Sequence, residues 1–221
     1  MLRRRNSIKW IASAFLVLLA ASSLTACSIF GTSWNRKITV VVDTPGGEVS
    51  ASSVQSESIS DQSGWWVPPE ARGAQRELRG EAVVLDLGQN RYLFALLGKP
   101  DTFAVLAPSE APLQAASRLA KLRGAHPIPK SEYPMFVTFT DTQNPMSVKE
   151  VKPETMSDTL GPGFALKSIT LEITDEPVTD GKIELVAPWL KEENPVFVNW
   201  RAYPADHPLR SINKQVFLRR R

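Results

Sequence analysis

The hydrophobic pattern consists mainly of short apolar runs separated by turn residues. Residues 37–44 are apolar and β-branched, 45–47 read Pro-Gly-Gly, and 48–58 alternate valine with small polar residues. Such an order predicts a β-hairpin whose second strand has one wet face. A second hairpin is predicted from the apolar runs 81–88 and 91–98, which flank the tight turn Gln89-Asn90 and form the best candidate for the centre of the core.

Further strand-like runs follow along the chain. They cover residues 102–108, 135–141, 146–151, 164–175, 182–186, 195–203 and 211–219. Strands at about ten-residue spacing, with turn signals between them, are typical of an antiparallel β-sandwich or barrel. We therefore predict a mainly β fold, an antiparallel β-sandwich or barrel-like domain with one short helix.

Two stretches depart from the strand pattern. Ser109 is a candidate helix cap, and the residues that share one face of the helix behind it are Leu113, Ala116, Leu119 and Ala120, with Gly124 as the stop. Residues 59–80 have no periodicity and are rich in Pro, Gly, Ser and Arg, so they predict a long loop, with room for a short helix between Pro69 and Leu78.

The first 23 residues have the pattern of an export signal. Four cations and no acid occur in the first ten residues, and residues 11–23 form an apolar run. That run is shorter than the roughly 20 residues that a membrane-spanning helix needs, which favours a segment that is removed. An uncleaved anchor over residues 8–26, with Cys27 as a bystander, is the alternative.

Leu24-Thr25-Ala26-Cys27 resembles the bacterial lipobox. The resemblance implies a diacylglycerol on the Cys27 thiol, cleavage before Cys27, and acylation of the new amino group by a fatty acid such as palmitate. Ser28 stands where Asp would favour inner-membrane retention, so the outer membrane is favoured and the protein faces the periplasm. The predicted organisation is a signal peptide (1–26), a lipidated tether (27–36) and a single β-rich domain (37–221).

Residues close to Cys27 are candidates for contact with the bilayer. Ile29, Phe30 and Trp34 are apolar or aromatic, and aromatic residues often lie at membrane interfaces. Docking of these side chains onto the folded domain is the alternative.

Charge and cysteine content exclude several function classes. The chain has a net charge of +3, but removal of the leader takes away four cations, so the remainder is close to neutral and no nucleic-acid partner is expected. Cys27 is the single cysteine, so its lipidation leaves no thiol for a disulfide, a nucleophile or a metal cluster. We expect no cofactor.

Motifs for catalysis or metal binding are weak. His126 and His207 have no ligand-type neighbour at metal spacing. The stretch 211–214 matches the Ser-x-x-Lys motif of penicillin-recognising enzymes, but it lacks the supporting SDN and KTG elements and does not begin a predicted helix. The sequence therefore assigns no catalytic residue and no metal ligand.

The most suggestive feature for recognition is the pair Trp65-Trp66, followed by Arg72 and Arg76. Trp and Arg are enriched at interaction hot spots, and sugar rings or peptides stack on tryptophan. We predict that these four residues bind an envelope protein or a glycan. The alternative is that the tryptophans cover a sandwich edge.

The remaining sequence is similar to uncharacterised proteobacterial lipoproteins. The likeness lies in the segments 34–54, 80–97 and 169–190, and it implies no activity. We expect a membrane-anchored, non-enzymatic binding or structural module. The alternative is an envelope hydrolase whose carboxylates are dispersed in the sequence, which a cleft that gathers two or more acids with raised pKa values would favour.

Overall fold

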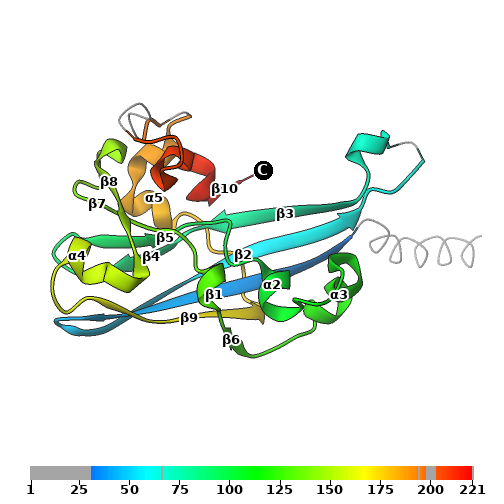
Figure 1. The fold of residues 1–221 in the computed structure, drawn as a ribbon, viewed down its shortest axis with the longest axis horizontal. Coiled ribbons are helices and arrows are strands. Elements are labelled where there is room, and N and C mark those ends of the chain that lie inside the picture. Colours follow the sequence, from blue (N-terminus) through cyan, green and yellow to red (C-terminus); the bar gives the residue numbers. More distant parts are fainter. Residues whose placement is uncertain (1–30, 66, 194, 198–202, 221) are drawn as a thin grey trace, which may run out of the picture.

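Two antiparallel sheets form the body of the molecule (Figure 1). The computed structural model describes residues 31–221 except 66, 194, 198–202 and 221. The larger sheet has six strands in the order β10-β3-β2-β1-β9-β6, and the smaller has four in the order β4-β5-β7-β8. The sheets do not close into a barrel, so the predicted mainly β class is confirmed in its sandwich form.

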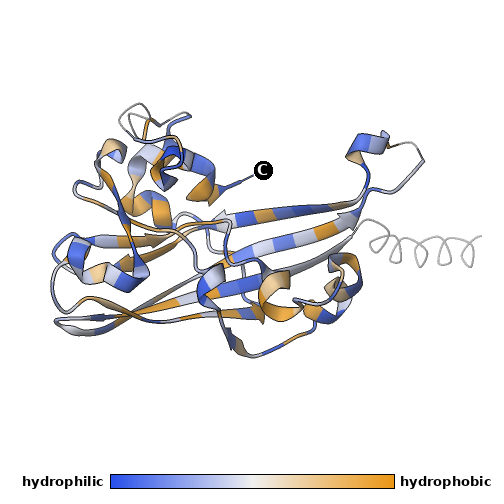
Figure 2. Cartoon of the chain, in the orientation of Figure 1, coloured by the Kyte–Doolittle hydropathy of each residue, from blue (hydrophilic) through white to orange (hydrophobic). Residues whose placement is uncertain are grey.

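The long strands of the larger sheet follow the alternation of the sequence. The six strands are β1 (Thr32–Thr44), β2 (Gly47–Asp61), β3 (Ala74–Glu81), β6 (Ala125–Pro127), β9 (Ala165–Thr174) and β10 (Leu218–Arg219). In β1 every second residue from Trp34 to Val42 is buried, which gives one face to the core and one to solvent. Figure 2 shows the alternation as bands of hydrophobic and hydrophilic residues along these strands.

The smaller sheet begins with the predicted Gln89-Asn90 hairpin. Its strands are β4 (Val83–Asp86), β5 (Tyr92–Ala95), β7 (Phe136–Phe139) and β8 (Val148–Val151). Gln89 and Asn90 have φ values of 53° and 58°, and the N–H of Arg91 donates to the carbonyl of Gly88. Two positive φ values in a two-residue turn match the twist of a hairpin, so this hairpin is confirmed.

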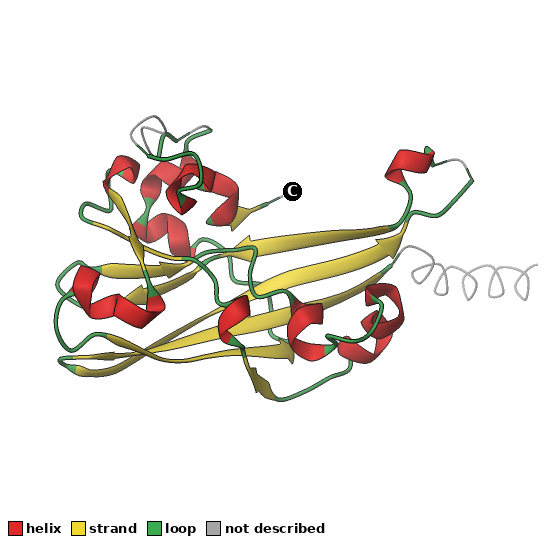
Figure 3. Ribbon diagram, in the orientation of Figure 1, coloured by secondary structure: helices red, strands yellow, loops and turns green. Residues whose placement is uncertain are grey.

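The smaller sheet is buried on both of its faces. One face packs against the larger sheet around a mainly aliphatic core that includes Val40, Leu85 and Leu171. The other face is covered by helical segments from the C-terminal part of the chain (Figure 3). The second core is aromatic, and its rings belong to Phe94, Phe139, Trp189, Phe197 and Phe217. The architecture is therefore a sandwich with a helical third layer.

The described residues contain more helix than the sequence predicted. The α-helices are α2 (Thr102–Leu106), α3 (Pro112–Leu119), α4 (Met156–Leu160) and α5 (Lys182–Val186). Short 3-10 helices are η2 (Pro69–Ala71), η3 (Lys130–Glu132), η4 (Pro145–Ser147), η5 (Pro153–Thr155), η6 (Pro188–Lys191), η8 (Pro208–Ser211) and η9 (Lys214–Val216). Helix α3 confirms the predicted helix, although it begins with Pro112 after Ala111 and not at Ser109. No helix in the described part of the chain is both long and apolar enough to cross a bilayer.

Two predicted strands are helices. Residues 102–106 form α2 because the Asp101 carboxylate accepts hydrogen bonds from the N–H groups of Phe103 and Ala104. Residues 182–186 form α5, whose first N–H groups donate to the Glu81 carboxylate from a distant strand. A short apolar run does not distinguish helix from strand, and here the caps decide the outcome.

The C-terminal strand predictions are also wrong in large part. Residues 211–217 contain η9 and part of η8, and strand structure is limited to Leu218–Arg219 of β10. In the predicted strand 195–203, residues 198–202 lie outside the described residues and Pro195, Val196 and Phe197 are not in a strand. These segments instead provide side chains, including Phe217, to the aromatic core.

The predicted loop at 59–80 is shorter in the structure. Strand β2 continues to Asp61 and β3 begins at Ala74, so the loop covers only residues 62–73, with η2 inside it. The polar residues of β3 hid the strand, because four of its residues are exposed.

The boundary predicted between tether and domain is also displaced. Strand β1 begins at Thr32, inside the predicted tether 27–36. Trp34 is only 5% exposed and packs edge-on against Phe103 at 5.7 Å between ring centroids, so it docks onto the domain and does not face a bilayer. Ile29 and Phe30, with the signal peptide and Cys27, lie outside the described residues.

Candidate functional site

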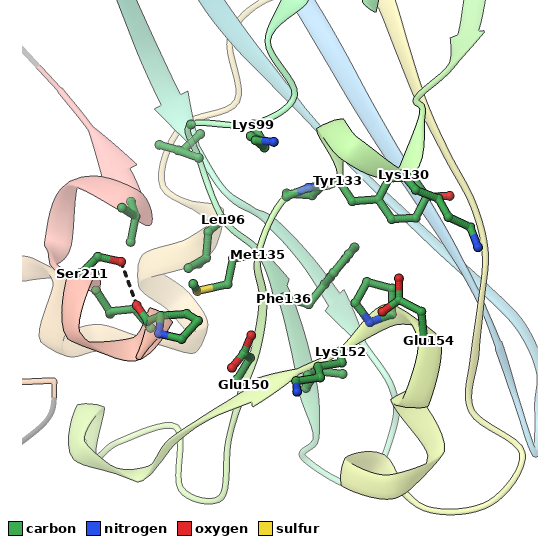
Figure 4. Close-up of a pocket in the computed structure, with 18 residues that line it drawn as sticks. Leu96, Lys99, Lys130, Tyr133, Met135, Phe136, Glu150, Lys152, Glu154 and Ser211 are labelled. Atoms are coloured by element: carbon green, nitrogen blue, oxygen red, sulfur yellow. Dashed lines mark hydrogen bonds between the residues drawn. The ribbon is translucent and has the colours of Figure 1, made fainter. Parts of the chain in front are cut away.

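A cavity of about 620 Å³ opens beside the smaller sheet (Figure 4). Its walls come from the end of β5, from β7 and β8, from the segments around η3 and η5, and from η8 and η9. The lining residues are Leu96, Leu97, Gly98, Lys99, Lys130, Tyr133, Pro134, Met135, Phe136, Glu150, Val151, Lys152, Pro153, Glu154, Pro208, Ser211, Ile212 and Val216. Volumes of this size suit a small organic ligand.

The interior of the cavity is apolar. Leu96 and Met135 lie next to each other, and Phe136 stands at the centre of the view in Figure 4. Ile212 adds an aliphatic wall from the C-terminal segment. An apolar surface of this kind favours the hydrocarbon or aromatic part of a ligand.

The polar groups of the cavity are mostly lysines and glutamates. Lys99 donates a hydrogen bond to the carbonyl of Ser131 and lies 3.6 Å from Glu132. Lys130 and Lys152 form no ion pair within the part of the chain that the structure describes. Glu150 and Glu154 also line the cavity, but neither is paired with these two lysines, so the two ammonium groups can still contact a ligand anion.

Nucleophilic chemistry has little support in this cavity. Ser211 is the one hydroxyl side chain of the Ser-x-x-Lys match, and its Oγ donates to the Pro208 carbonyl at 2.7 Å. The lining residues include no histidine that would activate it. Ser211 belongs to η8, a single 3-10 turn, and does not begin an α-helix.

The predicted Trp-Arg binding cluster lies on the β2–β3 hairpin. Trp65 is in the hairpin tip, residues 62–73, and is 85% exposed. Arg72 holds the tip together, because its guanidinium donates to the carbonyls of Val67 at 2.9 Å and Trp65 at 3.4 Å. Trp66 lies outside the described residues.

Arg76 belongs to the base of the same hairpin and not to the tip. Its guanidinium is 2.8 Å from both Glu57 and Asp101 and lies over the ring of Phe103, 4.6 Å from its centroid. The structure therefore does not bring Arg76 together with Trp65 in the way that the sequence predicted.

The base of the hairpin contains a buried charge network that the sequence analysis did not identify. Arg36 and Glu57 are 2% and 3% exposed and lie 3.5 Å apart. Arg36 donates to the Pro100 carbonyl at 2.6 Å and to Thr102 at 3.0 Å, and the Thr102 hydroxyl donates to Glu57 at 2.5 Å. Gln55 accepts a further bond from Arg36 at 3.1 Å. The sequence did indicate that Arg36 is buried, because side chains alternate along a strand and position 36 lies on the same face of β1 as the other buried residues.

The network changes the pKa of its members. Burial lowers the pKa of Arg36 despite the opposing charge of Glu57. Burial alone would raise the pKa of Asp101, but Arg76 and the N–H groups of Phe103 and Ala104 outweigh it, so the pKa lies below its usual value. Hydrogen bonds to Asp101 and Glu57 raise the pKa of Arg76. The shifts of Asp101 and Arg76 both favour the charged forms of these two groups near neutral pH.

Of the two histidines, His207 has a structural partner, whereas the buried Nε2 atom of His126 has no hydrogen-bond partner among the described residues. The Nδ1 atom of His207 accepts a hydrogen bond from the N–H of Leu209 and so caps η8. Glu184 and Asp180 pair with Arg220 at 2.6 and 3.0 Å. Within the described residues, no group of three or more His, Cys, Asp or Glu side chains is arranged to hold a metal ion.

Comparison with known proteins gives no relative for this chain. No protein-family model, curated protein sequence or solved structure matches it significantly.

Proposed function

We propose that the chain is an exported lipoprotein, anchored in the membrane through Cys27 and facing the periplasm, and that its folded part is a non-enzymatic binding module. The outer membrane is favoured because Ser28 follows Cys27. Each acyl CH₂ in the bilayer contributes about 0.8 kcal/mol, and two or three chains hold a protein durably.

The observation that carries the binding role is the 620 Å³ cavity, which has an apolar interior and two lysines, Lys130 and Lys152, that form no ion pair among the described residues. An apolar interior selects for a ligand with a hydrocarbon or aromatic body, and Lys130 and Lys152 select for an anionic group at its end. The ligand class that fits best is therefore an amphipathic anion. An envelope protein or glycan could present the same groups as part of a larger partner.

The anchor is tested on the protein isolated from membranes. Mass spectrometry should find a chain that begins at an acylated Cys27, and the protein should remain in the membrane fraction after a salt wash. The variant Cys27→Ser should leave the membrane fraction or retain its leader. A wild-type protein with Met1 in place and a bare thiol would disprove the anchor.

The cavity is tested with anilinonaphthalene sulfonate, a fluorescent aromatic anion. The wild-type protein should bind it saturably, and Lys130→Gln/Lys152→Gln should weaken binding at least about fivefold, a loss of about 1 kcal/mol. The matched control is Lys121→Gln/Lys191→Gln, which removes two exposed lysines that do not line the cavity. Equal binding by all three proteins would contradict a ligand site at this cavity.

A second function, a hydrolase that uses dispersed carboxylates, is favoured by one observation. Glu150 and Glu154 both line the cavity, so it brings together two acids that are four residues apart in the sequence. Hydrolysis of ester and glycoside substrates by the wild type, abolished in both Glu150→Gln and Glu154→Gln, would support it. Activity that survives both substitutions would remove these carboxylates from the mechanism.

A further inference from the structure

The chain enters the fold at a fixed point beside the end of β2. Thr32, the first residue of β1, pairs with Ile59, and Gly31 has a φ of 137°. A Cβ atom at Gly31 would lie 2.6 Å from the carbonyl oxygen of Ile59. Only glycine fits this approach, so Gly31 lies directly against the main chain of β2.

The hairpin tip projects from this same end of the molecule. Strand β2 ends at Asp61, two residues beyond Ile59, and continues directly into the tip (residues 62–73). Figure 1 shows the tip beside the start of β1, at the opposite end of the long sheet from the turn between β1 and β2. Gly31 follows Cys27 by four positions along the chain, a reach of at most about 14 Å. A lipid on Cys27 would therefore hold the tip next to the bilayer surface.

The tip has the composition of a membrane-interface segment. Its described residues include one acid and one base, Glu70 and Arg72, and an almost fully exposed Trp65. Tryptophan prefers the headgroup level of a bilayer because its ring is apolar and its N–H is polar. The turn at the opposite end, residues 43–48, has no aromatic residue and carries Asp43 and Glu48.

Hydrogen bonds inside the tip lower the cost of moving it out of water. Arg72 donates to the carbonyls of Val67 and Trp65, and the N–H of Val67 donates to the carbonyl of Gly64. Pro68 and Pro69 have no N–H to satisfy. Fewer unpaired main-chain groups mean a smaller desolvation penalty at the interface.

We propose that the hairpin tip inserts Trp65 into the lipid headgroup region beside the acylated Cys27, so that the protein is held at two points. This inference rests on the proposed lipid anchor. Two attachment points fix the orientation of the sheet, with its long axis away from the membrane and the turn between β1 and β2 at the far end. The cavity then faces the periplasmic space at a constant height.

The test uses the mature, acylated protein, which begins at Cys27, in phosphatidylethanolamine and phosphatidylglycerol vesicles. Ser63→Cys places a thiol in the tip, and Ser50→Cys places one near the far end of β2; both serines are exposed. Each thiol is labelled with a nitrobenzoxadiazole fluorophore, and quenching is measured with lipids that carry a spin label in the headgroup or shallow acyl region. We expect strong quenching and a blue shift at position 63 and neither at position 50.

A second comparison separates insertion from proximity. Trp65→Ala in the Ser63→Cys background should reduce quenching by shallow spin labels, whereas Trp65→Phe should retain most of it. Vesicle flotation is measured for every sample. Protein that floats but is quenched equally at positions 63 and 50 overturns the insertion and leaves the anchor intact. Protein that does not float, with Cys27 unmodified, overturns the anchor and the insertion together.

A macromolecular partner at the tip predicts a different result. In vesicles without other proteins or glycans, a tip built for such a partner would remain in water, and the probe at position 63 would not be quenched. That outcome overturns the membrane contact and returns Trp65 to the protein or glycan interface that the sequence suggested.

Discussion

The base and the tip of the β2–β3 hairpin have opposite physical designs. At the base, Arg36, Glu57, Arg76 and Asp101 form a network of ion pairs and hydrogen bonds in which Arg36 and Glu57 are buried and Arg76 and Asp101 are partly exposed. At the tip, Trp65 exposes its ring, and the tip's arginine binds main-chain carbonyls. Two parts of one hairpin therefore differ: polar contacts inside the protein dominate the base, whereas the tip carries a large side chain that is mostly exposed to solvent.

Breaking the base at Arg36 should have the largest effect. Arg36→Met leaves Glu57 buried with one fewer positive partner and removes the donors to Gln55, Pro100 and Thr102. We expect the free energy of unfolding, measured by urea denaturation, to fall by about 3–5 kcal/mol. The double variant Arg36→Met/Glu57→Gln should recover part of this loss. If the free energy of unfolding of Arg36→Met lies within about 1 kcal/mol of the wild-type value, the network does not stabilise the fold as a unit.

Two glycines of the hairpin differ in the space available for a side chain, which is small at Gly80 and open at Gly73. Gly80 has a φ of 129°, and a Cβ atom there would lie 3.1–3.3 Å from atoms of Gln55 at the base. Gly73, beside the tip, has a φ of 127° and open space around it. Both alanine variants are strained, but Gly80→Ala also crowds Gln55, so we expect a loss of about 2–3 kcal/mol against about 1 kcal/mol for Gly73→Ala. Equal urea midpoints would contradict the crowding at the base.

Low pH should weaken the charge network at the base of the hairpin, because Asp101 becomes protonated. Because the folded-state pKa of Asp101 lies below its unfolded value of about 4, its contribution is complete above that value and is lost as pH falls through the folded pKa. Asp101→Asn retains a helix cap but removes the charge. We expect it to lower the unfolding free energy by at most about 1 kcal/mol at pH 7, since Asp101 and Arg76 are 39% and 34% exposed.

The same variant provides the control for the pH effect. The difference in unfolding free energy between wild type and Asp101→Asn should shrink toward zero as urea titrations are repeated from pH 7 to pH 2. A difference that stays constant with pH would assign the effect to altered capping and not to the carboxylate charge.

Removal of the tryptophan at the tip should have the smallest effect on stability. Trp65→Ala should change the unfolding free energy by less than about 0.5 kcal/mol, because the ring is 85% exposed. The control is Trp34→Ala, which removes a buried ring and should cost about 3–5 kcal/mol. A large loss of stability for Trp65→Ala would mean that the tip also supports the fold.

Local turn chemistry explains which parts of the fold could be predicted from the sequence. Pro45-Gly46-Gly47 and Gln89-Asn90 mark turns whose geometry depends on the residues themselves, so both hairpins were found. Helix α5 was missed because its cap is the Glu81 carboxylate, which comes from a strand about a hundred residues earlier. Tertiary caps of this kind have no local sequence signal.

The candidate sites were likewise predictable only where neighbouring residues carry the signal. The exposure of Trp65 agrees with a simple reading of a polar, proline-flanked loop, and the lipobox remains a prediction from four adjacent residues. The cavity was not predictable, because its lining comes from segments between Leu96 and Val216 that are joined only by folding. The buried Arg36 was accessible in principle, since strict alternation along β1 places it inward.

The two faces of the smaller sheet are covered by parts of the chain that are synthesised at different times. The strands that pack on its first side have all been made once β9 is complete at Thr174, but the segments that cover Phe94 and Phe139 come later, between Ile183 and Leu218. A nascent chain that has been made only as far as β9 therefore exposes the aromatic side chains of Phe94 and Phe139, because the segments that bury them are still missing.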